Sequence, residues 1–295
     1  MKHFQIYCSH GFANRYAGLI AGITLSRLCN LEPKIIWHSN HTFRSEFYDI
    51  FSPINNFEVL NTPISEYFKV GKNYNLFSWD NDRYLDFFEY DVCHHPKNLD
   101  IESFLNLVNS SDKPVFYYAP FINDWIPKEE IKKTIQSIKF NKEIEDSVNK
   151  FIVNNNLING YEGIHIRLTD NQHLFNFQDI DLLINSIKEN NHKKFFVCSD
   201  NPDVEKKFNE YSNVYVFSKK YKTEKLFPNL DWRLEDHESF KTEDQIDIIY
   251  NVERSNEHCK ESVIDFLLLS HSTSYYTSNC STFSQLSKII KDYIK

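Results

Sequence analysis

An arginine and an aspartate follow a short apolar segment within Gly163–Asp170. The pattern of Gly163–Ile166 predicts a buried strand, so Arg167 and Asp170 would stand where that strand ends. Open α/β folds bind ligands outside the carboxyl ends of their strands, and a guanidinium there suits a phosphate or diphosphate. Arg167 is therefore a candidate anion-binding residue. The alternative is a strand-end arginine that only pairs with a neighbouring carboxylate.

Two further segments join a predicted strand to a predicted helix and carry polar side chains. Ser278–Ser284 combines hydroxyls with the free N–H groups of a helix start, which could hold a phosphate without a lysine or a metal. Cys198–Pro202 places Asp200 at the tip of a turn. The alternative for both is that these side chains only cap the next helix.

Polar residues also stand at two other helix starts. Gly11–Arg15 has a single glycine where a dinucleotide fingerprint needs three, so NAD binding is poorly supported. Asn14 and Arg15 would instead face anions or hydroxyls at a helix N-terminus, or form only a cap and a surface arginine. Asp265 precedes the apolar run Phe266–Leu269 and could either cap a helix or accept hydrogen bonds from a guanine edge.

Alternating strands and helices would position these residues. Phe4–Cys8, Tyr16–Cys29 and Lys34–Trp37 are predicted as strand, helix and strand, which form a βαβ unit. Gly18 and Gly22 lie four residues apart on one face of that helix. Because they lack a side chain, they would let the helix sit close to its sheet.

The second half of the chain repeats the alternation, which predicts an α/β fold of two Rossmann-like domains facing each other across a cleft. Asparagines 154–156 and Gly160 indicate a helix end and a connector. We therefore expect an N-terminal domain over residues 1–155 and a C-terminal domain over residues 156–295. A terminal helix beginning near Thr282 could pack back on the first domain.

Charge, cysteines and hydropathy limit the function classes. The 295-residue chain has a net charge of -8, which argues against nucleic acid as its main partner. Its six cysteines are scattered and are expected to be free thiols. We expect a cytoplasmic protein, because no secretory h-region opens the chain and no apolar stretch reaches the roughly 20 residues of a transmembrane helix. Peripheral membrane contact stays open.

Two clusters invite a zinc site, but neither has suitable ligand spacing. Cys93-His94-His95 lacks a spaced second pair, and His38 with His41 lacks cysteine or carboxylate partners at the usual separations. We therefore expect no bound metal.

Taken in order, these segments resemble the fucosyltransferase superfamily of GT-B glycosyltransferases, which includes α1,2- and α1,6-fucosyltransferases and protein O-fucosyltransferases. His165-Ile166-Arg167 corresponds to the family's His-x-Arg motif. Gly11–Arg15 is similar to the family's Gly-x-x-Asn-Arg/Gln turn, and Trp37 followed by Phe47–Phe51 is similar to its Phe-x-Asp-Leu-Phe segment. Ser199-Asp200 corresponds to the family's Thr/Ser-Asp turn. Asp265 with Ser281-Thr282-Phe283 corresponds to its Asp-Leu…Ser-Ser/Thr-Phe block.

The resemblance implies an inverting transfer of fucose from GDP-fucose to a glycan hydroxyl, with no metal or other cofactor and with the donor held mainly by the C-terminal domain. It implies that Arg167 contacts the diphosphate and the departing oxygen, and that His165 and Asp265 hold the guanine. The other residues expected to bind the donor are Asn14, Arg15, Asp200, Ser281, Thr282 and Phe283.

Two positions depart from the family pattern. Leu168 stands where many members carry a second basic residue, so diphosphate contacts would be fewer or would come from Arg15 or Lys288. The glutamate that serves as the base in α1,6 enzymes is also absent, and the acceptor base stays open. The candidates are Asp170 first, followed by His173 and Asp179.

Two alternatives to fucosyl transfer remain. The same fold could use a different GDP-sugar, or the chain could be a nucleotide-sugar or glycan-binding module without catalysis. Arg167, Asn14 and Ser281-Thr282-Phe283 argue for catalysis, whereas the missing glutamate argues weakly for the module.

Overall fold

The chain folds into two compact units in the computed structural model. The described part of the first unit lies within Met1–Lys139, and the second unit consists of Phe140–Leu230 and Asn251–Lys295. The structure describes residues 2–39, 43–54, 57–63, 65–78, 89–168, 177–220, 224–225, 252–253, 255–277 and 281–294.

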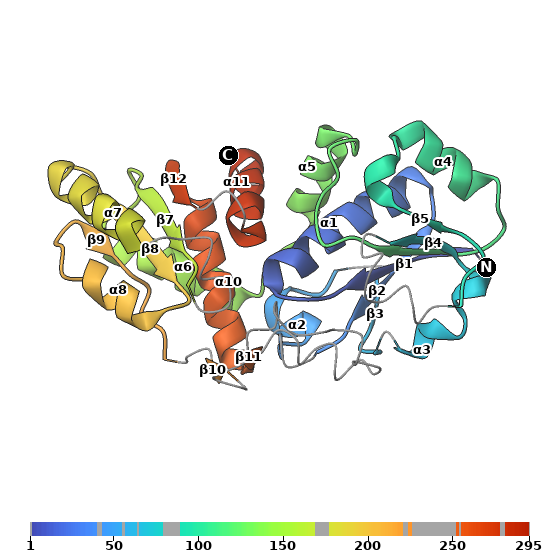
Figure 1. Cartoon of the computed structure of the whole chain (residues 1–295), viewed down its shortest axis with the longest axis horizontal. Coiled ribbons are helices and arrows are strands. Elements are labelled where there is room, and N and C mark those ends of the chain that lie inside the picture. The colour runs from blue at the N-terminus through green and yellow to red at the C-terminus, as the bar shows by residue number, and fades with distance from the viewer. Residues whose placement is uncertain are drawn as a thin grey trace. The chain divides into compact units, whose positions relative to one another are not determined.

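A parallel sheet forms the centre of the first unit (Figure 1). Its central strand is β1 (His3–Cys8), which is buried beyond its first residue, as the inner strands of parallel sheets are. The other strands are β2 (Glu32–Trp37), β3 (Glu58–Leu60), β4 (Asn75–Ser78), β5 (Cys93–His94) and β6 (Val115–Tyr118), in the order β3-β2-β1-β6-β4-β5.

Helix α1 (Phe12–Leu28) packs against this sheet at very short range. A Cβ atom on Gly18 would lie 2.7 Å from the carbonyl oxygen of Ala119, and one on Gly22 would lie 2.5 Å from the Ile6 side chain. Any side chain at these positions would push α1 off the sheet. The predicted role of the two glycines is confirmed.

An aromatic cluster closes the end of this core. Trp37, the last residue of β2, makes edge-to-face contacts with Phe47 and Phe51 around α2 (Phe47–Ile50). Glu46 and Asp49 begin α2 with a capping box, which fixes where the segment turns. The other helices of this unit are α3 (Ser65–Phe68), α4 (Ile101–Asn109), α5 (Lys128–Ser137) and two 3-10 turns at Gly71–Asn73 and Pro96–Asn98.

The second unit is built on a parallel sheet in the order β12-β7-β8-β9. Its strands are β7 (Glu162–Ile166), β8 (Phe195–Ser199), β9 (Val214–Tyr215) and β12 (Ser274–Thr277), and β10 (Glu224–Lys225) pairs separately with β11 (Val252–Glu253). Its helices are α6 (Lys142–Asn154), α7 (Phe177–Glu189), α8 (Pro202–Phe208), α10 (Asn256–Ser270) and α11 (Thr282–Ile294).

Helix α10 organises the second unit. It contacts β7, β8, α6 and α11, as the central red and orange helix of Figure 1 illustrates. Gly163 of β7 makes this packing possible, because a Cβ there would lie 2.7 Å from the side chains of both Leu269 and Ser272. The terminal helix α11 belongs to this unit and packs on α10.

Three boundaries differ from those expected. Helix α1 begins at Phe12, so Asn14 and Arg15 lie inside its first turn. Helix α10 begins at Asn256. Ser255 caps α10 by accepting a hydrogen bond from the backbone N–H of His258 (3.2 Å). The two units divide between Lys139 and Phe140, ahead of α6, whereas the expected boundary followed that helix. Helix α6 contacts α10, which places it in the second unit.

Candidate functional site

The carboxyl ends of β7 and β8 bring His165, Arg167 and Asp200 to one edge of the second sheet. His165 is paired with Thr277 of β12 and with Cys198 of β8. Arg167 leaves the sheet directly after β7, and Asp200 directly after β8. The expectation that a buried strand ends just before Arg167 is therefore confirmed.

His165 is buried and connects this edge to the start of α11. Its Nδ1 lies 2.7 Å from Ser284 Oγ, and its ring stacks on Phe283 with centroids 4.7 Å apart. Phe283 also makes an edge-to-face contact with Phe266 of α10 at 5.3 Å. These contacts bring β7, α10 and the first turn of α11 together.

Ser281 stands just before α11 but does not act as a side-chain cap. Its side chain is buried, with 1% of the residue exposed, and its Oγ has no hydrogen-bond partner among the described residues. Its backbone carbonyl accepts a hydrogen bond from the Gln285 N–H (2.9 Å). A buried hydroxyl without a partner is costly unless something else binds it. Thr282 and Phe283 follow in the first turn and are partly exposed.

Asp200 connects β8 to β7 and leaves helix capping to its neighbour. Its Oδ1 accepts a hydrogen bond from the Leu168 N–H (2.7 Å), whereas Asn201 caps α8 by accepting from the N–H groups of Asp203 and Val204. The alternative role of Asp200 as an N-cap is therefore wrong. The contact with Leu168 fixes the backbone directly after Arg167, which is partly exposed.

Leu168 belongs to the core of the second unit. It is buried with Ile164, Ile166 and Ile180. A cationic side chain at this position would lose its hydration in an apolar environment. Leu168 is thus a core residue, and it supplies no second cation beside Arg167.

Asp265 lies in the middle of α10 rather than at its start, so the alternative role as a helix cap is wrong. It is 4% exposed, and its Oδ2 lies 2.8 Å from Lys219 Nζ. Its Oδ1 has no hydrogen-bond partner within the described part of the chain.

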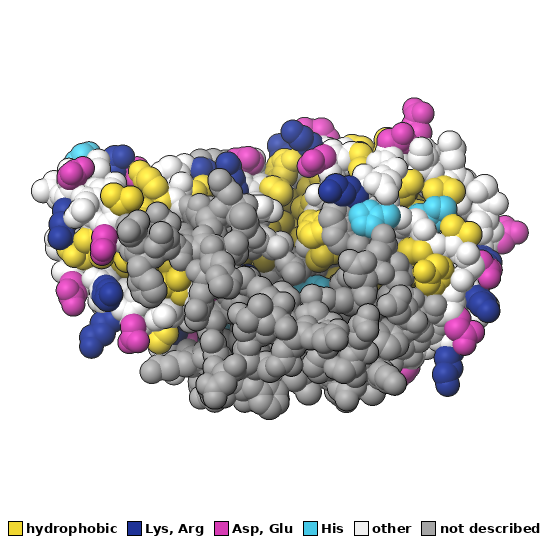
Figure 2. Space-filling model, viewed as in Figure 1, with side chains coloured by type: hydrophobic (Ala, Val, Ile, Leu, Met, Phe, Trp, Pro, Cys, Tyr) yellow, Lys and Arg dark blue, Asp and Glu magenta, His cyan; other side chains and the backbone are white. Residues whose placement is uncertain are grey.

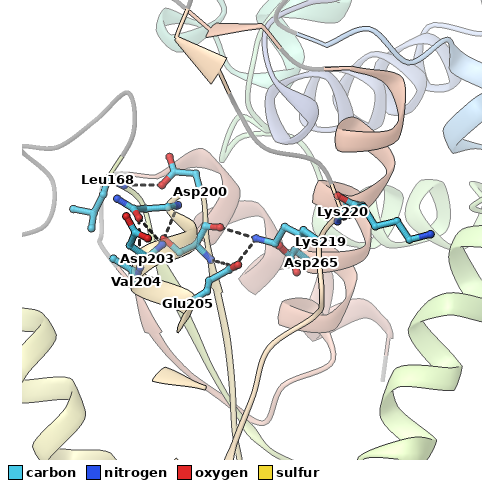
Figure 3. Close-up of polar contacts among 11 residues, drawn as sticks. Leu168, Asp200, Asp203, Val204, Glu205, Lys219, Lys220 and Asp265 are labelled. Atoms are coloured by element: carbon cyan, nitrogen blue, oxygen red, sulfur yellow. Dashed lines mark hydrogen bonds and ion pairs between the residues drawn. The ribbon is translucent and has the colours of Figure 1, made fainter. Parts of the chain in front are cut away.

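Lys219 is a largely buried cation that no pattern in the sequence indicates. Its Nζ also contacts Glu205 Oε1 (2.5 Å) and donates to the carbonyl of Ser199 (2.6 Å), so it joins α8, β8 and α10. Figure 3 shows its ammonium between the carboxylates of Glu205 and Asp265. Lys219 follows β9 in an irregular segment, where no local pattern distinguishes it from a surface lysine.

Burial and charge set the protonation of this cluster. Burial raises the pKa of Asp265 to about 7, while Lys219 acts in the opposite direction. Burial alone would lower the pKa of Lys219, but the two carboxylates outweigh burial and raise it, so the ammonium stays charged. Burial also raises the pKa of Glu205. Asp265 is thus an acid whose charge depends on its partner.

Arg15 is buried inside the first unit. It is 0% exposed, and it donates hydrogen bonds to the carbonyl oxygens of His10 (2.7 Å), Cys8 (3.0 Å) and His38 (2.7 Å). Its guanidinium also lies 5.2 Å from the centroid of the Trp37 ring. These contacts join β1, β2 and α1, so they give Arg15 a structural role in place of the surface position weighed as the alternative.

The remaining candidates are Asn14, Lys288, Asp170, His173 and Asp179. Asn14 is partly exposed in the first turn of α1, and its role stays a prediction. Lys288 is exposed on α11. Asp170 and His173 lie outside the described residues, and only the helical backbone of Asp179 is described.

The described residues contain no group of three or more His, Cys, Asp or Glu side chains arranged to hold a metal ion. Two of the candidate zinc ligands have other contacts: His94 lies against the ring of Phe77, and His95 accepts a hydrogen bond from the Lys97 N–H (3.2 Å).

Charged side chains of both signs lie on the surface. In Figure 2, basic and acidic side chains are interspersed over the coloured part of the visible face. Among the helices that the structure describes, none is long and apolar enough to cross a membrane.

Solved structures share this fold over nearly the whole chain. The fucosyltransferase NodZ from Bradyrhizobium matches with a TM-score of 0.56 and 14% identity, covering 98% of this chain and 93% of that one. POFUT1 in its apo form matches with a TM-score of 0.50 and 11% identity, covering 99% and 96%. NodZ has also been crystallised and soaked with GDP-fucose, and POFUT1 has been solved in complex with GDP.

No protein-family model and no curated protein sequence matches the chain. The likeness therefore rests on tertiary structure, because identities of 11–14% show the fold alone. The expected fold class is confirmed: this chain has the fold of the GT-B fucosyltransferases NodZ and POFUT1.

Proposed function

We propose that this protein is an inverting glycosyltransferase that moves fucose from GDP-fucose to a hydroxyl of a glycan acceptor, without a metal. The fold shared with two fucosyltransferases supports the class of reaction. The residues gathered at the edge of the second sheet support a nucleotide-diphosphate donor. The proposal assigns the donor to the second unit.

The observation that carries the proposal is the buried, unpartnered hydroxyl of Ser281 at the start of α11. A phosphate oxygen would accept a hydrogen bond from this hydroxyl and from the free backbone N–H groups of the first helical turn. The helix dipole adds a favourable charge interaction. Thr282 and Phe283 supply the next positions of the same turn.

The proposed guanine contacts lie beside this phosphate position. Phe283 stacks on His165 and contacts Phe266, the residue after Asp265. The unpartnered Oδ1 of Asp265 could accept a hydrogen bond from the N–H donors of a guanine edge. In this proposal His165, held by Ser284, and Asp265 bind the base while Ser281 binds phosphate.

Arg167 would act on the chemistry itself. Sugar transfer passes through an oxocarbenium-like state while negative charge builds on the leaving diphosphate. A permanently charged guanidinium stabilises that charge, and the backbone after Arg167 is fixed by the Leu168–Asp200 hydrogen bond. Asp170 is the proposed base that takes the proton from the acceptor hydroxyl.

Thermal unfolding with GDP, UDP and CMP tests the donor. A ligand that binds only the folded state adds about 2.7 kcal/mol of stability at 100 times its Kd. We expect GDP to raise the melting temperature far more than the other two nucleotides. Equal or absent stabilisation by all three would contradict the proposal.

A second candidate keeps the site and changes the donor sugar, and a third lacks catalysis. Slow hydrolysis of GDP-fucose without acceptor, compared with GDP-mannose, separates them. Hydrolysis of GDP-fucose alone supports the first proposal, and hydrolysis of another GDP-sugar supports the second. GDP binding with no hydrolysis of any GDP-sugar and no transfer to glycans supports a binding module.

A further inference from the structure

We propose that Lys219 is a positioning residue that orients Asp265 and thereby sets the preference of the site for guanine over adenine. The inference rests on the proposed function, because it assumes a nucleotide at the edge of the second sheet. It concerns a residue that no motif in the sequence marks. The two carboxylate oxygens of Asp265 have different partners, and this difference could select the base.

Lys219 engages one of these oxygens and leaves the other without a partner. Its Nζ lies 2.8 Å from Asp265 Oδ2, while Asp265 Oδ1 has no hydrogen-bond partner in the described regions. A carboxylate held in this way presents one oxygen in a fixed direction. Without the lysine, the carboxyl group could rotate or gain a proton, and either change would remove the defined acceptor.

Lys219 is itself held firmly. It contacts Glu205 Oε1 at 2.5 Å and donates to the Ser199 carbonyl at 2.6 Å. Glu205 in turn accepts a hydrogen bond from the Ser199 N–H (2.8 Å), so the cluster is tied to the carboxyl end of β8. Figure 3 shows the carboxylates of Glu205 and Asp265 beside the ammonium. A buried lysine with this many partners has little freedom to move away from Asp265.

The cluster would distinguish the bases because they differ in donors. Guanine carries N–H donors at N1 and at its 2-amino group, which a carboxylate oxygen accepts. Adenine has an unprotonated N1 at the equivalent place, so its lone pair would face the charged oxygen. A site built to pair with a donor rejects an analogue that lacks it, because the buried acceptor is then left unpaired.

Binding of GDP and ADP to the wild-type chain and to Lys219→Met tests the inference by isothermal calorimetry. We expect the ratio of ADP Kd to GDP Kd to fall at least about 10-fold in Lys219→Met, mainly through weaker GDP binding. A purely structural role would weaken both nucleotides together and leave the ratio unchanged. An unchanged ratio in folded Lys219→Met would overturn the inference.

Lys193→Met is the matched control. Lys193 forms a 2.8 Å ion pair with Glu162 in the same unit, but Glu162 begins β7 and stands at the opposite end of that strand from Arg167. The substitution is chemically identical and removes a similar ion pair. We expect the ratio of the two dissociation constants to stay within about twofold of the wild type, because this partly exposed contact lies at the end of β7 away from Asp265.

A double variant keeps the test valid if Lys219→Met does not fold. Lys219→Met with Glu205→Gln removes one cation and one anion, so the charge of the cluster is preserved while Asp265 loses its partner. We expect this variant to lose base selectivity, whereas Glu205→Gln alone keeps it. Selectivity retained in the double variant would overturn the inference.

The same measurements separate the inference from the proposed function. If the wild-type chain does not prefer GDP over ADP, the proposed donor fails and the inference with it. If the wild-type chain prefers GDP and the lysine variants prefer it equally, only the inference fails.

Discussion

Two cations, one held inside each unit, have different sets of partners. Arg15 of the first unit donates to three backbone carbonyl oxygens and lies against aromatic rings. Lys219 of the second unit is surrounded by Glu205, Asp265 and one carbonyl. The first arrangement joins the guanidinium to the ends of two neighbouring strands and to the turn before α1. The second orients carboxylates and leaves one of their oxygens without a partner.

The partners of a buried cation indicate whether it has a structural or a functional role. A cation held by carbonyls fixes strand ends, and removing it should cost stability. A cation held by acids controls their charge and direction, and removing it should cost specificity.

The largest effect is expected at Arg167, which is partly exposed in the second unit. Arg167→Ala should lower the transfer rate by roughly 10² to 10⁵-fold, by analogy with other residues that stabilise phosphate charge or oxyanions. Arg167→Lys should also be impaired, because an ammonium lacks the planar fork that matches a diphosphate. Steady-state kinetics with GDP-fucose measure both variants.

Arg27→Ala is the matched control for Arg167→Ala. Arg27 lies in the last turn of α1, at the opposite end of the helix from Gly11. Its guanidinium donates hydrogen bonds to Thr134 and Ser137. We expect normal turnover for this variant. Near-normal turnover in Arg167→Ala would remove the assignment and leave Arg167 as a strand-end residue.

Arg15→Met tests the first side of the comparison. The change removes the donor from two buried carbonyl oxygens and one partly buried one, so we expect a loss of about 3 kcal/mol in the free energy of unfolding. Urea denaturation measures it. Stabilisation by GDP should persist in the folded variant. Normal stability with loss of GDP binding would instead make Arg15 a ligand contact.

Gly163→Ala tests the packing that holds Asp265 over the sheet. The new Cβ would lie 2.7 Å from both Leu269 and Ser272, so the end of α10 must shift, at a cost of about 1–3 kcal/mol. Thermal and urea unfolding check this. Gly11→Ala is the contrast: its Cβ would meet no atom within 4 Å, and we expect a change within about 0.5 kcal/mol.

The pH dependence of GDP binding gives the smallest effect. Burial raises the pKa of Asp265 from an ordinary value near 3.8 to about 7, in a setting that includes Lys219, Glu205 and Glu261. Guanine needs the ionised carboxylate, so GDP affinity should fall as the pH drops below 7, by at most about tenfold per pH unit.

Asp265→Asn provides the control for the pH series. The variant keeps the titration of the GDP phosphate but has no acid at position 265, so the additional loss of affinity below pH 7 should disappear. The sign for folding is opposite: a raised pKa means that this acid contributes most to stability at low pH. That contribution is lost as the pH rises from about 3.8 to about 7. An identical pH profile in Asp265→Asn would contradict the guanine contact.

Much of the fold could be predicted from local patterns. The strand before Arg167, helix α6 and the start of α11 at Thr282 follow from apolar periodicity and polar helix starts. The short strands β4 and β5 were not anticipated, since an isolated segment of a few residues carries little periodic signal.

The candidate site was only partly predictable. His165, Arg167 and Asp265 were proposed from their motif and position, but the local sequence could not separate capping from ligand binding. Asp200 and Ser281 show why: both are typical cap residues, yet Asn201 caps α8 and the Ser281 hydroxyl is left without a partner. Which of two adjacent polar residues caps a helix depends on backbone geometry.

The sequence by itself determined the alternation of strands and helices and the edge at which Arg167 stands, because these depend on side-chain periodicity over a few residues. Only the tertiary structure decided that Arg15 is buried with hydrogen bonds to backbone carbonyl oxygens. The same holds for the ion pair between Lys219 and Asp265. The physical reason is distance along the chain. Contacts between residues on different elements arise from packing, and no local pattern encodes them.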